Sequence, residues 1–176
     1  MDPRYPIGQF EWEGGISEDQ RERWIREIEA FPGRLKDAVK AFTPDQLELS
    51  YREGGWNVRQ LVHHLADSHM NSLIRFKLAL TEDTPTIKPY YEDRWAELGD
   101  VQNGEIGISL TLLEMLHRRW ALLLRSMQDS DYARSFLHPE SGKTIRLDYC
   151  LGSYVWHGNH HLAHIGLVQD RLSSAE

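Results

Sequence analysis

The sequence is poor in cysteine and in positive charge, and it has no long apolar run. Cys150 is the single cysteine among 176 residues, which excludes a disulfide framework and fits a reducing, cytoplasmic compartment. Asp and Glu total 27 against 20 Lys and Arg, for a net charge of −7. A general nucleic-acid binder needs clustered positive charge, and a membrane span needs about 20 apolar residues. We therefore expect a cytoplasmic protein with no nucleic-acid or membrane partner.

Several common catalytic motifs are absent too. The chain has no GxSxG, P-loop, GxGxxG or CxxC pattern. Motifs therefore give no support to a serine hydrolase with a nucleophile elbow, to a nucleotide-binding protein or to a dithiol redox protein. The length suits one domain, and 40% hydrophobic with 27% charged residues is typical of a globular chain. We predict a single domain over 1–176, in which residues 1–16, rich in proline, glycine and aromatic residues, form an extended N-terminal arm.

Helical periodicity predicts four long helices, over 17–41, 57–80, 109–127 and 148–172. Ser17 and Asn57 are capping residues for the first two, because each is followed three positions later by a glutamine. Pro32 is expected to kink or restart the first helix. Two connections are long: 83–108, with a short helix near 91–98, and 135–147, irregular or a hairpin. Helices joined in this way predict an all-α fold, a four-helix bundle.

Nine histidines are many for this length, and four of them lie close together near the C-terminus: His157, His160, His161 and His164. Residues four apart on a helix are neighbours about 6 Å apart, so two HxxxH pairs are possible, 157/161 and 160/164. Either pair could present two imidazoles to one metal ion. The helical wheel places 160 and 164 in one stripe beside the apolar one, which favours that pair slightly and leaves both open.

The second helix offers a third imidazole from His63, His64 or His69. His64 shares its stripe with a polar row that could line a cavity, made of Ser68, Asn71 and Arg75. His63 shares its stripe with Arg59, Met70 and Lys77, which is typical of the border between the buried and exposed sides of a helix. His69 falls in the centre of the apolar stripe, where a packed core histidine is expected.

Three imidazoles on two facing helices would form a site suited to zinc or nickel. Three protein ligands leave a position for water or substrate, as in catalytic zinc sites, and the metal would activate water or a thiol as nucleophile. The alternative is a set of histidines that satisfy one another or face solvent. His117 and His138 show no partner pattern, and Cys150 has no neighbouring base, so we assign them no chemical role.

Three stretches resemble the YfiT branch of the DinB-like family: YPIG, GGWNVRQLVHHLADSHMNSLIRFKLALTEDTP and YVWHGNHHLAHI. The resemblance covers nearly the whole chain. It implies an up-down-down-up four-helix bundle with a divalent metal, zinc or alternatively nickel, held by one histidine of the second helix and an HxxxH of the last. Carried over to this chain, the metal ligands are His64, His160 and His164. The residues expected to line the pocket or support the ligands are Ser68, Asn71, Arg75 and His157.

The same resemblance implies a metal-dependent hydrolase that acts on a small molecule and forms a homodimer. One alternative is a thiol S-transferase that delivers a low-molecular-weight thiol, such as bacillithiol, to an electrophile. Another is a metal-binding bundle without catalysis. The sequence supports hydrolysis and thiol transfer almost equally. Both reactions use an open metal position to deliver a nucleophile as its anion.

Overall fold

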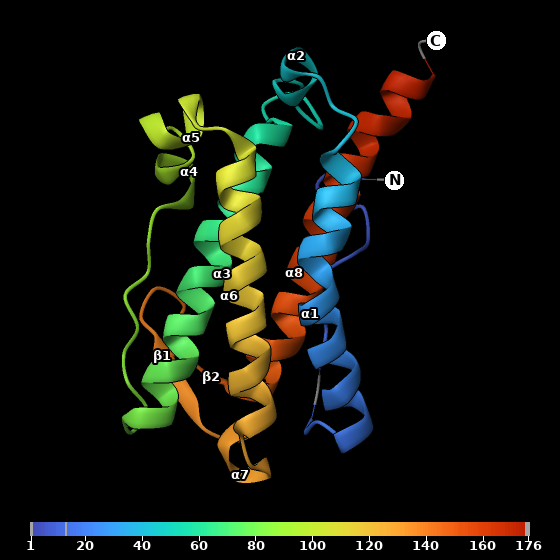
Figure 1. The fold of residues 1–176 in the computed structure, drawn as a ribbon. Helices are drawn as coiled ribbons and strands as arrows, with labels where there is room; N and C mark the ends of the chain where they lie inside the picture. Colours follow the sequence, from blue (N-terminus) through green and yellow to red (C-terminus); the bar gives the residue numbers. More distant parts are fainter. Residues whose placement is uncertain (1, 13, 175–176) are drawn as a thin grey trace.

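The computed structural model describes residues 2–12 and 14–174 (Figure 1). Its long helices pack as a bundle and are α1 (Glu18–Val39), α3 (Val58–Thr81), α6 (Ile106–Ser126) and α8 (Leu147–Ser173). The named strands of the described residues form one short hairpin. The predicted all-α four-helix bundle is confirmed. None of the helices in the described part is long and apolar enough to cross a membrane.

The caps predicted for α1 and α3 are present. Ser17 Oγ accepts a hydrogen bond from the Gln20 amide at 3.2 Å. At α3, Asn57 Oδ1 accepts from the Gln60 amide at 2.8 Å, and the Asn57 amide donates to Gln60 Oε1 at 3.0 Å. This reciprocal pair satisfies two backbone donors that the first helical turn leaves free, and it fixes where the helix that carries His64 begins.

Pro32 lies inside α1, which continues through it as one helix from Glu18 to Val39. The predicted restart is therefore wrong. Proline has no N–H, so the carbonyl of Ile28, four residues earlier, lacks its usual helical partner. That carbonyl instead accepts a hydrogen bond from His117 Nδ1 of α6 at 2.6 Å. The side chain of a neighbouring helix thus satisfies the backbone group that the proline leaves free.

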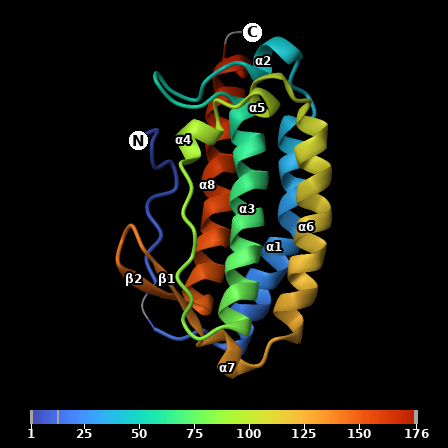
Figure 2. The ribbon, with the colours of Figure 1, turned by 90° about the vertical axis from the view of Figure 1, so that its left-hand side faces the viewer.

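The topology explains the long connection between α3 and α6. α1 and α8 run upward in Figure 1, whereas α3 and α6 run downward, so the order is up-down-down-up. Because α3 and α6 are parallel, the chain between them must return along the whole bundle, and Figure 2 shows it running beside α3. α1 and α3 each pack against both α6 and α8, which places α3 and α8 side by side.

Short helices lie at the ends of the bundle: α2 (Pro44–Leu47), α4 (Glu92–Trp95), α5 (Gly99–Asn103) and α7 (Asp129–Tyr132). A hairpin of β1 (Ser135–His138) and β2 (Lys143–Arg146) lies along its side, against α3 and α8 (Figure 2). The two strands pair antiparallel, with Gly142 in the turn at a φ of 65°. The long connection is fixed to this hairpin, because the Leu137 amide donates to the Pro85 carbonyl at 2.9 Å and the Ile87 amide donates to the Leu137 carbonyl at 3.1 Å.

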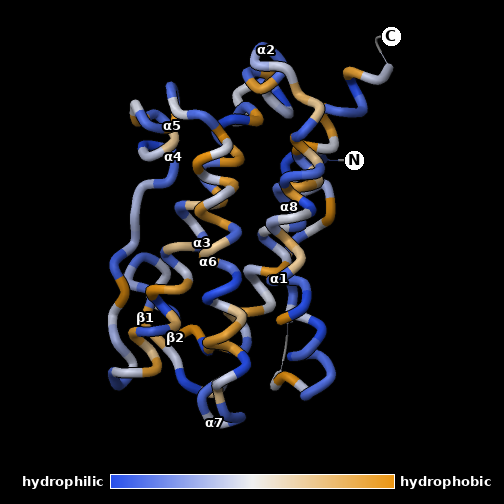
Figure 3. Tube along the Cα trace, in the orientation of Figure 1, coloured by the Kyte–Doolittle hydropathy of each residue, from blue (hydrophilic) through white to orange (hydrophobic). Residues whose placement is uncertain are grey.

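The core consists of two apolar clusters separated by a layer of buried histidines. One cluster contains Leu73 and Trp120, and the other contains Leu65 and Leu113. Between these positions along α3 and α6 lie His69 and His117, both fully buried. Figure 3 shows hydrophilic residues interrupting the apolar ones along the long helices. The middle of the bundle is therefore polar, and it is here that the histidines of α3 and α8 meet.

Candidate metal centre

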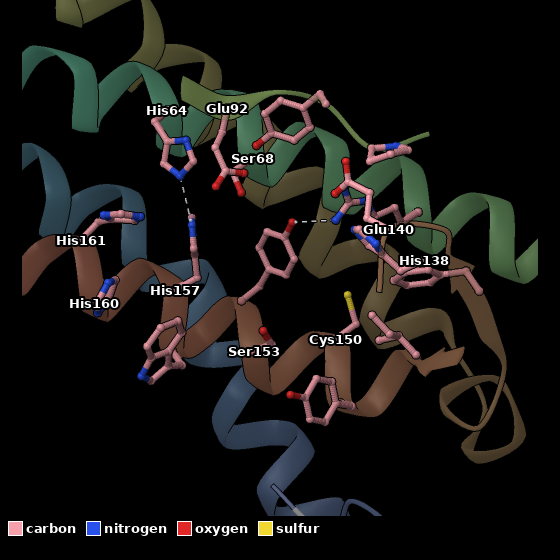
Figure 4. A pocket seen from close by; sticks show the side chains of 18 of the residues that line it. His64, Ser68, Glu92, His138, Glu140, Cys150, Ser153, His157, His160 and His161 are labelled. Carbon is pink, nitrogen blue, oxygen red and sulfur yellow. Dashed lines mark hydrogen bonds between the residues drawn. The ribbon is translucent and has the colours of Figure 1, made fainter. Parts of the chain in front are cut away.

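Three histidines from two helices converge near the middle of the bundle. Ring nitrogens of His64 on α3 and of His157 and His161 on α8 all lie within 4.8 Å of one another. The Nε2 atoms of His64 and His157 are 3.2 Å apart. Figure 4 shows the rings facing one another across the two helices. The four-residue spacing of the α8 pair places both rings on the side of the helix that faces α3.

The structure does not bring together the predicted ligand set of His64, His160 and His164. His160 stacks on Trp156, with ring centroids 4.5 Å apart, and His164 stacks on Tyr51 at 3.9 Å. Among the described residues, they group with His161 and not with His64. The helical wheel favoured the 160/164 pair only slightly, and the carry-over from the family resemblance placed the HxxxH on His160 and His164. In the structure α8 is turned so that His157 and His161 group with His64. The ligand set that the geometry supports is His64, His157 and His161.

These three imidazoles are suited to hold a divalent cation. Burial lowers the pKa of His64 to about 4. Burial and the neighbouring histidines lower the pKa of His157 and His161 well below the ordinary value. All three rings are therefore neutral near pH 7, with lone pairs available, and neutral imidazole nitrogens are good ligands for zinc and nickel.

A cavity of about 430 Å³ adjoins the three histidines. Ser68 and Arg75 line it, as predicted, and Arg75 Nη1 donates a hydrogen bond to the Tyr154 hydroxyl at 3.5 Å. Asn71 does not line this cavity. Its side-chain amide donates a hydrogen bond to the Asp67 backbone carbonyl at 2.9 Å, and the residue borders a separate hollow. Three protein ligands beside such a cavity leave room for a substrate at the metal.

Glu92 and His138 also line the cavity, and the sequence placed neither of them there. Figure 4 shows Glu92 near His64 and Ser68. Burial raises the pKa of Glu92, with additional contributions from Asp93 and Glu140. A carboxyl group with a raised pKa beside a metal site is suited to proton transfer. Glu92 begins α4 within the long connection. The short helix predicted near 91–98 does not indicate which cavity this side chain lines, because that depends on the tertiary fold.

Cys150 borders the same cavity, but its thiol is unsuited to nucleophilic attack. Burial raises its pKa to about 11, so the thiol stays protonated near pH 7. Its sulfur lies 3.8 Å from Ser72 Oγ. His63, the other candidate of the second helix, lies outside the centre, since its Nδ1 is 2.7 Å from Ser109 Oγ and its Nε2 is 3.3 Å from the Gly104 carbonyl.

Comparison with known proteins identifies the family. Residues 27–165 match the DinB superfamily. The chain belongs to this superfamily. Within the DinB superfamily it is 51% identical over 168 residues to "Putative metal-dependent hydrolase YfiT" of Bacillus subtilis (strain 168), covering 96% of this chain and 94% of that protein. It is 52% identical over 172 residues to a Bacillus mycoides (strain KBAB4) protein of the same description, covering 98% of each.

Solved structures agree with this membership of the DinB superfamily. The structure of YfiT from Bacillus subtilis, described as a probable metal-dependent hydrolase with an unusual four-helix bundle topology, matches with a TM-score of 0.96 at 49% identity over 98% of this chain and 99% of that chain. A mycothiol-dependent maleylpyruvate isomerase matches with a TM-score of 0.60 at 17% identity, over 80% of this chain and 60% of that chain. The latter similarity shows a shared fold.

Proposed function

We propose that this protein is a metal-dependent hydrolase whose divalent metal, zinc or alternatively nickel, is held by His64, His157 and His161. The observation that carries the proposal is the convergence of three neutral imidazoles, two buried and that of His157 half-buried, beside a cavity of about 430 Å³. The proposal is also supported by the relatives, which are named as putative metal-dependent hydrolases. The substrate would be a small molecule, because the cavity is of the size that small ligands occupy.

The cavity residues have distinct chemical roles in this proposal. A divalent cation bound by the three imidazoles would supply a Lewis acid and lower the pKa of water. Glu92 would accept the proton of the attacking water and return it to the leaving group, since its raised pKa brings it closer to neutral pH. Arg75 would bind an anionic or carbonyl group of the substrate, and its contact with the Tyr154 hydroxyl holds the guanidinium at the cavity wall.

Metal content tests the ligand set. We would measure metal per chain, by inductively coupled plasma mass spectrometry, in tag-free wild type and in His64→Ala, His157→Ala, His161→Ala and His160→Ala. We expect about one equivalent of zinc or nickel in the wild type and in His160→Ala, and its loss in the other three. Loss in His160→Ala with retention in His157→Ala would instead support the ligand set predicted from the sequence. The wild type and the metal-retaining variant would then be assayed with ester and amide substrates.

Thiol transfer is the second candidate function. The cavity continues from the three histidines past Ser68 to Arg75, which leaves room for a thiol cosubstrate at the metal and an electrophile beside it. Stoichiometric loss of added thiol in the presence of an electrophile, with no hydrolysis of esters or amides, would favour this function. Stoichiometric metal with neither reaction would favour a metal-binding bundle without catalysis.

The homodimer implied by the family resemblance stays a prediction. Sedimentation equilibrium of the purified chain checks it directly, because the monomer mass of 20.5 kDa is readily distinguished from its double. Cytoplasmic location is likewise a proposal, and immunofluorescence or cell fractionation would test it.

A further inference from the structure

Behind the candidate metal centre, three histidines form a continuous chain of hydrogen bonds that ends on the backbone. His157 Nδ1 lies 3.2 Å from His69 Nε2, and His69 Nδ1 lies 2.7 Å from His117 Nε2. His117 Nδ1 lies 2.6 Å from the Ile28 carbonyl oxygen. This histidine chain, His157–His69–His117, crosses the bundle from α8 through α3 and α6 to α1. Because His69 and His117 are fully buried, bulk water does not compete for these contacts.

The Ile28 oxygen sets the direction of every hydrogen bond in the histidine chain. A carbonyl oxygen only accepts, so the hydrogen of His117 lies on Nδ1. A neutral imidazole carries one N–H, so His117 Nε2 accepts and the next hydrogen lies on His69 Nδ1. Because His69 carries its hydrogen on Nδ1, its Nε2 accepts, and the hydrogen of the His157 ring lies on Nδ1. His157 Nε2 is left with its lone pair, directed at the space it shares with His64.

The free carbonyl at the end of the histidine chain exists because of Pro32. In an uninterrupted helix the amide of residue 32 would donate to the Ile28 oxygen, but proline has no amide hydrogen. The Ile28 carbonyl is thus both buried and available. An unpaired carbonyl in the core would destabilise the folded protein. The His117 hydrogen bond removes that cost and fixes the orientation of the His117 ring.

We propose that His69 and His117 are positioning residues, which hold His157 in the tautomer that presents Nε2 to a divalent cation. The proposal rests on the metal site described above. Metal-ligating histidines as a rule donate their other N–H to an acceptor that fixes the ring, and loss of that acceptor typically weakens metal binding about 10–100-fold. Here the acceptor is a histidine, whose own tautomer has to be fixed by the next residue.

Packing holds these rings in place. Phe31 stacks on His69 and on His117, with ring centroids 5.3 and 5.5 Å apart and interplanar angles of 25° and 27°. Gly158 on α8 makes room for Phe31, because a Cβ at position 158 would lie 2.8 Å from the Phe31 ring. The stacked rings cannot turn without displacing Phe31, so their nitrogens stay aligned along the histidine chain.

The tautomers can be read directly in the metal-free wild-type protein. Long-range ¹H–¹⁵N correlation spectra distinguish the Nδ1–H from the Nε2–H tautomer of each histidine. We expect Nδ1–H for His157, His69 and His117. An Nε2–H tautomer at His157 would overturn the proposal. Since this measurement needs no metal, it decides the histidine chain even if the wild type proves unable to bind zinc, in which case only the proposed function fails.

Zinc affinity of matched variants provides the second test. His69→Leu removes the acceptor for His157 Nδ1–H, whereas the amide oxygen of His69→Gln can replace it. By competition with a chromogenic chelator, we expect zinc binding about 10–100-fold weaker in His69→Leu and largely restored in His69→Gln. Equal affinity of His69→Leu and wild type would contradict the proposal. Thermal unfolding of the metal-free variants confirms that each is folded, and the wild-type spectra decide the matter should His69→Leu fail to fold.

Discussion

The Nε2 atoms of His64 and His157 face each other at 3.2 Å, although the two residues are 93 positions apart in the sequence. Two nitrogen lone pairs at this distance repel, so in the metal-free protein one of the rings carries a hydrogen between them. The histidine chain makes His157 Nε2 an acceptor, and His64 Nε2 is therefore the donor. A cation bound by both nitrogens takes the place of that single hydrogen.

We predict opposite tautomers for these two ligands in the metal-free protein. His64 should be Nε2–H, while His157 is Nδ1–H. Binding of zinc should convert His64 to the Nδ1–H form and leave His157 unchanged, because only His64 has to release its Nε2 hydrogen to bind. Long-range ¹H–¹⁵N spectra before and after addition of one equivalent of zinc check this prediction. A single tautomer for His64 in both states would contradict it.

Zinc should stabilise the folded protein. A ligand present at about 100 times its Kd stabilises by about 2.7 kcal/mol when it binds the folded state alone. We expect the Tm of the wild type to rise with zinc and to fall back with chelator, and the Tm of His157→Ala to stay constant. His63→Ala is the matched control, since its ring contacts Ser109 and Gly104, and it should retain the full zinc response. A zinc response in His157→Ala equal to that of the wild type would argue against this residue as a ligand.

The metal-free protein should lose stability as the pH falls from about 6.5 to about 4. Burial lowers the pKa of His117 from 6.5 to about 4 despite its hydrogen bond to Ile28. Between these values the unfolded state binds a proton that the folded state does not, so the free energy of unfolding decreases with falling pH, by about 3 kcal/mol for this group. His64 contributes in the same direction. Urea unfolding at several pH values measures the effect. His117→Gln should show a shallower dependence, and an unchanged slope would contradict the assignment.

Pro32→Ala should change folding stability and metal binding in opposite directions. Alanine restores the backbone amide and favours the helix interior over proline by up to about 3 kcal/mol. The new amide competes with His117 for the Ile28 carbonyl, so the tautomers of the histidine chain become mixed and zinc binds more weakly. Urea unfolding and chelator competition measure the two effects. A gain in stability with unchanged zinc affinity would mean that Pro32 has no influence on the metal site.

Glu92→Gln should abolish most activity without loss of metal. General acid–base catalysis typically contributes about 10²–10⁴-fold to a rate, and we expect a decrease of this order in kcat with one metal per chain retained. Glu114→Gln, at an exposed position on α6 and outside the cavity lining, is the control and should remain active. Activity of Glu92→Gln close to that of the wild type would remove Glu92 from the reaction.

Local signals in the sequence predicted the bundle well. The Asn57–Gln60 capping box and the apolar periodicity place α3 correctly, because both depend on residues close in the chain. Parallel α3 and α6 could be expected from the family resemblance and from the length of the connection between them. Pro32 misled the prediction, since its effect depends on the orientation of His117 on another helix.

The candidate site was predictable only in part. His64, singled out from the sequence, belongs to the converging group. The choice between the two HxxxH pairs depends on how α8 is rotated about its axis, which the sequence does not give. His69 and His117 were interpreted as a core residue and as a residue without partners. His69 lies in an apolar stripe and His117 lies on another helix. Neither position indicates the hydrogen bonds between them, which form only when the helices pack.

The parallel course of α3 and α6 has a consequence for how such a protein can diversify. The return segment between them supplies Pro89, Tyr90 and Glu92 to the cavity, whereas the three converging histidines belong to the bundle helices. Replacements in this segment alter the walls that a substrate meets and leave the histidine geometry intact. One bundle can therefore present different cavity walls when this surface segment is exchanged, while the three converging histidines stay unchanged.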